Sequence, residues 1–250
     1  MTGSGGGGIV KVGRDMLLLG DCLDHMRALP SNSIDAVVTD PPYSSGTRRE
    51  GAKGLRKSMT RGHDDAAWFG TDSLTTNGFI WLMRACAIEW QRLLKPGGHV
   101  LAFIDWRMMP AMAGAIESAD LRHAGLLVWD KTYFGMGACF RNQHELILHF
   151  TKGVGNAPKR RDAGNVFSFK PIRNGDHPTQ KPIDLMRSLI SVVAGEGETI
   201  LDPFAGSGMT LAAGVLQGCN VIGIERDPTY FAIAQDRIAS VQPSFLHAAE

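Results

Sequence analysis

The residues best placed to do chemistry form a short turn, Asp40-Pro41-Pro42-Tyr43, which follows the β-branched run 34–38. The two prolines can continue neither a strand ladder nor a helix, so the chain must turn out of the sheet there. The turn presents a carboxylate, a carbonyl and an aromatic ring within four residues, a set that can hold a planar amine. The same residues would also suit a strand that simply ends, with Asp40 capping the turn.

A second candidate site is the glycine-rich segment 201–210, which lies between a predicted strand and a predicted helix. Its candidate cofactor-binding residues are Asp202, Pro203, Phe204, Ala205, Gly206, Ser207 and Gly208. Glycines allow a close approach of the backbone, and the N-terminus of a helix attracts anions. Glu225 ends the next strand, where it could accept hydrogen bonds from ribose hydroxyls, but Leu211 stands where the dinucleotide fingerprint has its third glycine. The pattern indicates an adenosine-containing cofactor without naming it, and a glycine turn that only packs is the alternative.

The elements that must position these residues follow from hydrophobic periodicity. Predicted strands cover 16–19, 34–39, 99–104, 125–129, 145–150, 199–201 and 220–224, and predicted helices cover 22–28, 79–93, 108–118, 182–193, a stretch ending at 217, and 228–239. Repeated alternation predicts an α/β fold with a doubly wound, mostly parallel sheet. Strands 125–129 and 145–150 have no clear helix between them, which predicts an antiparallel pair. We expect a single domain over residues 9–250, after a disordered glycine-rich start at 1–8.

Charge is distributed unevenly along the 250 residues, although the net charge is only +1. The segments 44–62 and 152–173 hold 12 of the 26 basic residues, and long loops are predicted there, at 44–76 and 151–176. Each loop alone would suit a solvated surface. Two basic loops in one chain favour a face that binds a polyanion.

The four cysteines are scattered, with no Cys-x-x-Cys pair. This argues against a zinc site or a disulfide framework and favours a reducing, cytoplasmic compartment. No apolar run reaches the roughly 18 residues that a membrane span needs. We therefore expect a cytoplasmic protein with no metal and no membrane partner.

Together the two motifs resemble the catalytic and S-adenosylmethionine motifs of the DNA amino-methyltransferases. Their order, with the catalytic motif first, resembles the permuted β group of that family. Residues 177–182, His-Pro-Thr-Gln-Lys-Pro, resemble the group's remaining cofactor-side motif. Residues 129–131 and 141–145 resemble its pattern around the last two strands, so that the resemblance spans residues 16–240.

The resemblance implies a Rossmann-like methyltransferase fold, with a seven-stranded sheet that contains one antiparallel strand, and S-adenosylmethionine as cofactor. By motif position, the residues lining this cofactor would be Asp202, Phe204, Gly206, Gly208 and, at its ribose, Glu225. Asp21 would lie near its adenine, and Thr179 and Lys181 near its methionine carboxylate. A homodimer is also implied. Segment 151–176 is short for a region that reads target sequence, which shifts that role towards loop 44–76.

The predicted reaction is methyl transfer to the N6 amine of adenine in double-stranded DNA, by a site-specific enzyme of the restriction–modification type. The base must flip out of the duplex to reach the turn. In the family that this sequence resembles, Asp before Pro-Pro-Tyr is usual for adenine enzymes and Ser for cytosine-N4 enzymes. The lack of a Pro-Cys motif argues against methylation of cytosine C5.

Three alternatives stay open. The turn would suit cytosine N4, and it would also suit a glutamine amide or an RNA base, because all present a planar amine. The alternative from another class is a non-catalytic nucleotide-binding module that docks on DNA. Asp40 argues against that module, since binding alone gives no reason to place a carboxylate on the turn.

Overall fold

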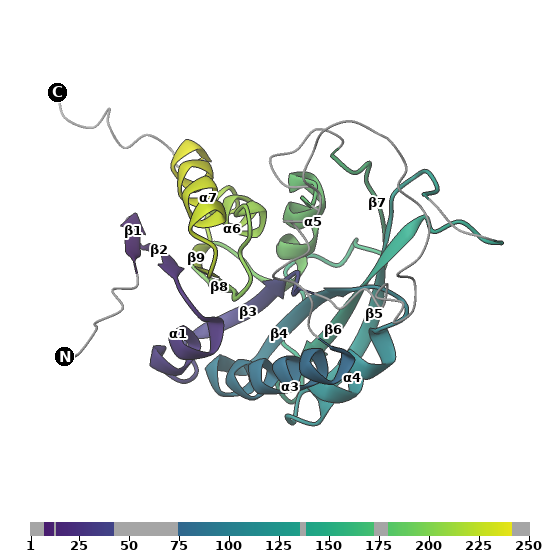
Figure 1. Cartoon of the computed structure of the whole chain (residues 1–250), viewed down its shortest axis with the longest axis horizontal. Coiled ribbons are helices and arrows are strands. Elements are labelled where there is room, and N and C mark those ends of the chain that lie inside the picture. The colour runs from purple at the N-terminus through teal and green to yellow at the C-terminus, as the bar shows by residue number, and fades with distance from the viewer. Residues whose placement is uncertain (1–7, 13, 43–74, 136–138, 173–179, 242–250) are drawn as a thin grey trace, which may run out of the picture.

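The computed structural model describes residues 8–12, 14–42, 75–135, 139–172 and 180–241. Their strands are β1 Ile9–Val12, β2 Asp15–Leu19, β3 Ile34–Thr39, β4 Leu94–Ile104, β5 Arg122–Asp130, β6 His144–Thr151, β7 Val166–Ser168, β8 Thr199–Asp202 and β9 Asn220–Glu225. Their helices are α1 Cys22–Ala28, α3 Thr76–Leu93, α4 Met109–Glu117, α5 Ile183–Val193, α6 Met209–Val215 and α7 Pro228–Val241. These strands form one nine-stranded sheet in the order β1-β2-β9-β8-β3-β4-β6-β5-β7, with helices on both faces (Figure 1).

The predicted fold class is confirmed, but the predicted number of strands is wrong. The seven predicted strands form the middle of the described sheet, and β1 and β7 add one short strand at each side. β6 runs antiparallel to β5 as predicted, and it also pairs antiparallel with β4. β1 runs antiparallel to β2 and is a second antiparallel strand. β7 pairs in parallel with β5, inside the segment predicted as loop 151–176. Runs of three or four residues are too short to show the period of two that marks a strand.

Helices α1, α3 and α4 cover one face of the sheet, and α5, α6 and α7 cover the other (Figure 1). Thr75 caps α3 by accepting the Gly78 N–H at 3.1 Å. Phe79, Met83 and Trp90 then recur at helical spacing and are fully buried in the core, as their periodicity predicted. No helix among the described residues is long and apolar enough to cross a membrane.

The connectivity of the sheet brings the ends of distant strands to one edge. β2, β9, β8, β3 and β4 are parallel neighbours, so their last residues, from Leu19 to Ile104, lie along the same side, which we call the carboxyl edge. β6 runs the other way, and its first residues therefore reach this edge as well. Ligands of open α/β sheets bind outside the carboxyl ends of the strands.

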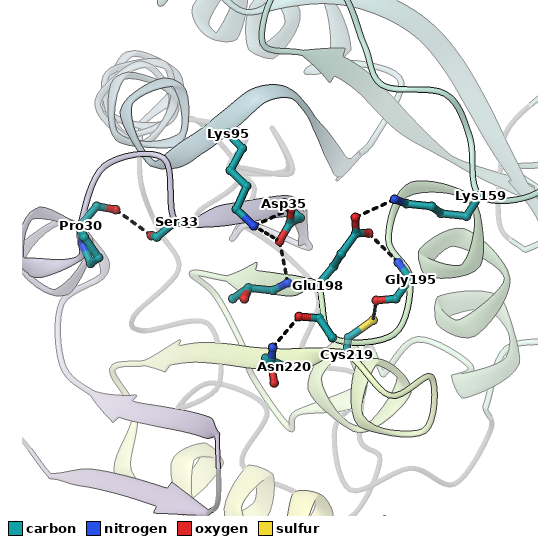
Figure 2. Close-up of polar contacts among 11 residues, drawn as sticks. Pro30, Ser33, Asp35, Lys95, Lys159, Gly195, Glu198, Cys219 and Asn220 are labelled. Carbon is teal, nitrogen blue, oxygen red and sulfur yellow. Dashed lines mark hydrogen bonds and ion pairs between the residues drawn. The ribbon is translucent and has the colours of Figure 1, made fainter.

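The opposite side, the amino edge, is held together by exposed ion pairs (Figure 2). Asp35, near the start of β3, accepts from Lys95 Nζ at 2.8 Å and from the Thr199 N–H at 2.9 Å. Glu198, just before β8, accepts from Lys159 Nζ at 2.6 Å. These contacts join the starts of β3, β4 and β8.

Candidate active site

Asp40 follows directly on β3 and so lies at the carboxyl edge. It is half-buried, Pro41 is buried and Pro42 is half-buried. The strand before them is fixed between β4 and β8, so the turn starts from a rigid support. Tyr43 lies outside the described residues, and its role stays a prediction.

A hydrogen bond joins this turn to the glycine-rich turn across 163 positions of sequence. Thr39 Oγ1 donates to Asp202 Oδ1 at 2.7 Å, and the Phe204 N–H donates to the same oxygen at 3.1 Å. Asp202 is only 2% exposed. Burial raises its pKa to about 6, although hydrogen bonds from Thr210, Thr39 and Phe204 act to lower it. The Asp202 carboxylate therefore fixes the glycine-rich turn beside the Asp40 turn.

Two glycines shape the turn between β8 and α6. Gly206 and Gly208 have φ angles of 51° and 81°, in the left-handed region that favours glycine. A Cβ added at Gly208 would lie 2.9 Å from Ala234 Cα, so α7 packs directly against the turn. A Cβ added at Gly206 would meet nothing within 4 Å, so the backbone there is open to a ligand. From α7, Arg237 donates a hydrogen bond to the Ser207 carbonyl and fixes the turn from behind.

Glu225 ends β9 and contacts the same turn. Its Oε2 accepts the Gly206 N–H at 2.8 Å, and its Oε1 accepts the Asp227 N–H at 2.7 Å. Burial raises the pKa of Glu225, and these backbone hydrogen bonds partly oppose that rise. The Gly20 N–H donates to the Glu225 carbonyl at 2.9 Å. The exposed Asp21, which is the N-cap of α1, directly follows Gly20 and so begins next to the end of β9. The fold thus brings Asp21, Gly206 and Glu225 together, although they are far apart in the sequence.

A second group of charges surrounds Asp40. Lys181, just before α5, donates from Nζ to Asp40 Oδ2, and the same Nζ lies 3.2 Å from Glu145 Oε2. The other oxygen of Glu145 accepts from Lys131 Nζ at 2.6 Å. Burial would lower the pKa of Lys181, but Asp40 and Glu145 outweigh it and raise the pKa. Burial would likewise raise the pKa of Glu145, yet Lys181 and Lys131 hold it below its usual value, so both side chains stay charged at neutral pH.

Two buried aromatic rings support this charged group. Lys181 Nζ lies 5.0 Å from the centre of the Phe103 ring and 5.9 Å from that of Trp129. Lys131 Nζ lies 5.1 Å from the centre of the Trp129 ring. Trp129 is itself fixed, because its indole N–H donates to the Phe169 carbonyl at 2.8 Å. The ring faces attract both ammonium groups.

Known proteins share both the sequence pattern and the fold. The model of the N6/N4 DNA methylase family matches residues 34–236. The chain belongs to the DNA methylase family. YubD of Escherichia coli (strain K12) is 33% identical over 223 residues, which cover 89% of either protein. The type II methyltransferase M.HinfI of Haemophilus influenzae is 28% identical over 257 residues, covering 91% of this chain and 69% of that protein.

Solved structures share the fold of this DNA methylase. TTHA0409 of Thermus thermophilus, complexed with S-adenosyl-L-methionine, matches with a TM-score of 0.66 and 22% identity, over 91% of this chain and 95% of that one. The cytosine-N4-specific PvuII DNA methyltransferase matches with a TM-score of 0.70 and 16% identity, over 89% of this chain and 86% of that one. At such low identity these two likenesses establish the fold alone.

The sequence assigned no role to Lys131 and Glu145 of this DNA methylase. A signal was available, because Lys131 directly follows β5 and Glu145 is the second residue of β6, so both must lie at the carboxyl edge. Thr179 lies outside the described residues. Its neighbour Gln180 donates from Nε2 to Met209 Sδ at 3.1 Å, which places segment 180–182 against the start of α6. Among the described residues, no group of three or more His, Cys, Asp or Glu is arranged to hold a metal ion.

Proposed function

We propose that this DNA methylase is a site-specific adenine-N6 methyltransferase that uses S-adenosylmethionine and flips its target base out of double-stranded DNA. The observation that carries the proposal is the half-buried Asp40 carboxylate, joined through Thr39 and Asp202 to a glycine-rich turn. Membership of the DNA methylase family and the cofactor bound to TTHA0409 support the choice of cofactor.

The residues of the glycine-rich turn fit this cofactor. The open backbone at Gly206 would admit its polar groups, while Glu225 and Asp21 would accept hydrogen bonds from its ribose and adenine. S-adenosylmethionine, when bound, supplies a methyl group on a sulfonium. Asp202 would contribute by holding the turn in shape, since its carboxylate is buried.

The turn at Asp40 would activate the acceptor amine. That nitrogen is a weak nucleophile, because its lone pair is delocalised into the base. Asp40 and the Pro41 carbonyl would each accept one of its N–H bonds, which draws the nitrogen towards tetrahedral geometry and stabilises the positive charge developing on it. Placing the reacting atoms in line supplies the rest, because no covalent enzyme intermediate is needed.

The target base would have to leave its stack to reach this turn, at a cost of a few kcal/mol. Stacking on Tyr43, worth about 1–3 kcal/mol, would offset much of that cost. Loop 44–76, described only from residue 75, remains our first candidate for contact with the DNA backbone, on the strength of its basic sequence.

In the basic segment 152–173, some of the described lysines lie at the amino edge and another lies at the carboxyl edge. Lys152 donates to the Leu94 carbonyl at 2.8 Å, and Lys159 pairs with Glu198, both at the amino edge. Lys170 instead follows β7, whose last residue pairs with Asp130 at the carboxyl edge. We therefore assign phosphate contact in segment 151–176 to its later part.

Adenine is proposed as the target because an acid stands before Pro-Pro-Tyr, the usual arrangement in adenine enzymes of the resembled family. The second candidate is cytosine N4. It stays open because the family model covers both chemistries, and the cytosine-N4-specific neighbour of the same fold is compatible with it. A homodimer, expected from the same resemblance, is a separate proposal that light scattering of the purified protein would test.

The test is incubation of the protein with S-adenosylmethionine and DNA, followed by digestion to nucleosides and identification of the product by mass. We expect N6-methyladenine. N4-methylcytosine without N6-methyladenine would overturn the choice of base. Transfer to RNA or protein but not to DNA would overturn the substrate. Cofactor binding without transfer to any of the three would favour the non-catalytic module.

A further inference from the structure

Lys181 contacts the carboxylate on which the proposed mechanism depends. Its ammonium donates to Asp40 Oδ2, and its side chain is 6% exposed against 25% for Asp40, so the lysine lies on the inner side of the carboxylate. A buried ammonium in this place fixes the orientation of the carboxylate. It would also oppose the positive charge that develops on the acceptor amine.

Glu145 supplies the charge that removes this conflict. It lies 3.2 Å from the same ammonium, so that Asp40, Lys181 and Glu145 together carry a net charge of −1. Without Glu145, Asp40 and Lys181 would form a neutral pair, and the acceptor amine would meet little negative potential. Lys131 pairs with the other oxygen of Glu145 at 2.6 Å and brings the charge of all four residues to zero. At 28% it is the most exposed of the four, so solvent screens its charge more than that of Lys181, which is 6% exposed.

We propose that Lys181 and Glu145 are positioning residues for Asp40: Lys181 orients the carboxylate, and Glu145 balances the charge of Lys181 so that Asp40 can still stabilise the reacting amine. Lys131 holds Glu145 in place from the surface side. The inference rests on the proposed function, because it requires Asp40 to act on the amine.

This role differs from the one that the family resemblance implies for Lys181, which is binding of the methionine carboxylate of the cofactor. The two roles separate in an experiment. A residue that orients Asp40 acts on kcat, whereas a residue that binds the cofactor acts on cofactor affinity.

The experiment uses Lys181→Met, Glu145→Gln and the double variant in the full chain. Calorimetry with S-adenosylhomocysteine measures cofactor binding, and kcat is measured with a methyl-transfer assay on DNA. We expect cofactor Kd to stay within about twofold of the parent, while kcat falls about tenfold or more in each single variant. Because Glu145 acts by balancing the charge of Lys181, Glu145→Gln should reduce kcat far less in the Lys181→Met background than it does alone.

Lys159→Met and Glu198→Gln are matched controls, because this pair has the same residue types and the same 2.6 Å distance as Lys131 and Glu145 but lies at the amino edge. They should leave kcat unchanged. Lys181→Arg is the second variant if Lys181→Met does not fold. It keeps the charge and should restore part of kcat.

Asp40→Ala, measured in parallel, separates a failure of the proposed function from a failure of the positioning role of Lys181. If Asp40→Ala still transfers methyl groups near the parental rate, the proposed function fails. If Asp40→Ala is inactive but Lys181→Met loses cofactor affinity and keeps kcat, the proposed function stands and the positioning role is wrong. If the double variant loses kcat by the product of the two single-variant losses, the two residues act independently, and the charge-balancing role of Glu145 is wrong.

Discussion

The two edges of the sheet carry the same kind of ion pair in different surroundings. At the amino edge, Lys159 and Glu198 meet at 2.6 Å, and the lysine is 40% exposed (Figure 2). At the carboxyl edge, Lys131 and Glu145 also meet at 2.6 Å, but Glu145 is shared with Lys181, which is 6% exposed and also contacts Asp40.

Distance alone does not determine what an ion pair does. An exposed pair contributes about 0–1 kcal/mol, because water and salt screen both charges. A buried charge has lost its hydration, and removing its partner leaves a large penalty. A buried lysine held between two carboxylates is therefore a costly arrangement. We connect this costly arrangement with the positioning role proposed for Lys181 rather than with stability.

The largest effect should come from Asp40 itself. We expect Asp40→Ala to reduce methyl transfer at least about a hundredfold, because it removes an acceptor aimed at developing charge. Cofactor binding, measured by calorimetry with S-adenosylhomocysteine, should stay close to the parent. Asp162→Ala, which removes an exposed carboxylate paired with Arg160, is the control and should leave the rate unchanged. More than a tenth of the parental rate in Asp40→Ala would remove Asp40 from the mechanism.

The next effect is on stability, and it compares the two edges directly. Lys181→Met leaves two carboxylates without their shared cation and should lower the free energy of unfolding by about 3 kcal/mol or more. Lys159→Met should lower it by less than about 1 kcal/mol. Urea denaturation of both variants measures the difference. Equal losses would mean that the Lys181 site is as well solvated as the amino edge.

A pH-dependent effect should follow from Asp202. Its pKa is higher in the folded than in the unfolded protein, so protonation of Asp202 stabilises the folded state. This stabilisation is complete below the unfolded pKa of about 4 and is lost as the pH rises through about 6. Asp202→Asn cannot ionise, so its stability relative to the parent should increase between these pH values, by roughly 2–3 kcal/mol. Urea denaturation across this pH range tests it, and parallel curves for parent and variant would show that Asp202 does not titrate as a buried acid.

Glu225 should have a smaller effect, confined to the cofactor. Glu225→Ala removes acceptors for the ribose and for the Gly206 N–H, and should weaken cofactor binding by about 1–3 kcal/mol. Calorimetry with S-adenosylhomocysteine measures the loss. Glu198→Ala, which removes a carboxylate just before the neighbouring strand β8 at the amino edge, is the control. Unchanged affinity in Glu225→Ala would show that this carboxylate only shapes the turn.

Much of the fold was predictable because its signals are local. The run before Asp40 and the run before Asp202 each lead into an Asp-Pro turn, and strands that end in parallel at one edge bring such turns together. The seven central strands and the antiparallel pair followed from periodicity and from the missing helix between β5 and β6. β7 was missed because Phe167 is the one buried residue in its three-residue strand, which leaves no pattern to detect.

The charged group around Asp40 was not predictable in the same way. The sequence shows that Lys181 precedes a helix and that Glu145 begins a strand. Which partners these side chains find depends on how α5 packs against the sheet beside β3 and β6. The family resemblance assigned Lys181 to the cofactor, whereas in the structure its ammonium contacts Asp40 and Glu145. In the structure this residue lies beside Asp40 at the carboxyl edge, and its partners there depend on packing that a motif does not describe.

The smallest effect should be on DNA binding, and it again contrasts the two edges. Lys170 follows β7 at the carboxyl edge, so Lys170→Met should reduce the slope of log affinity against log salt by at most about 1, the change expected for one phosphate contact. Lys159→Met removes the same charge at the amino edge, where Glu198 already pairs with it, and should leave the slope unchanged. Fluorescence anisotropy with a labelled duplex between about 50 and 200 mM salt covers the range in which phosphate contacts dominate. An equal change of slope in both variants would mean that the DNA wraps around to the amino edge, and a change in Lys159→Met alone would reverse our assignment of the DNA-binding side.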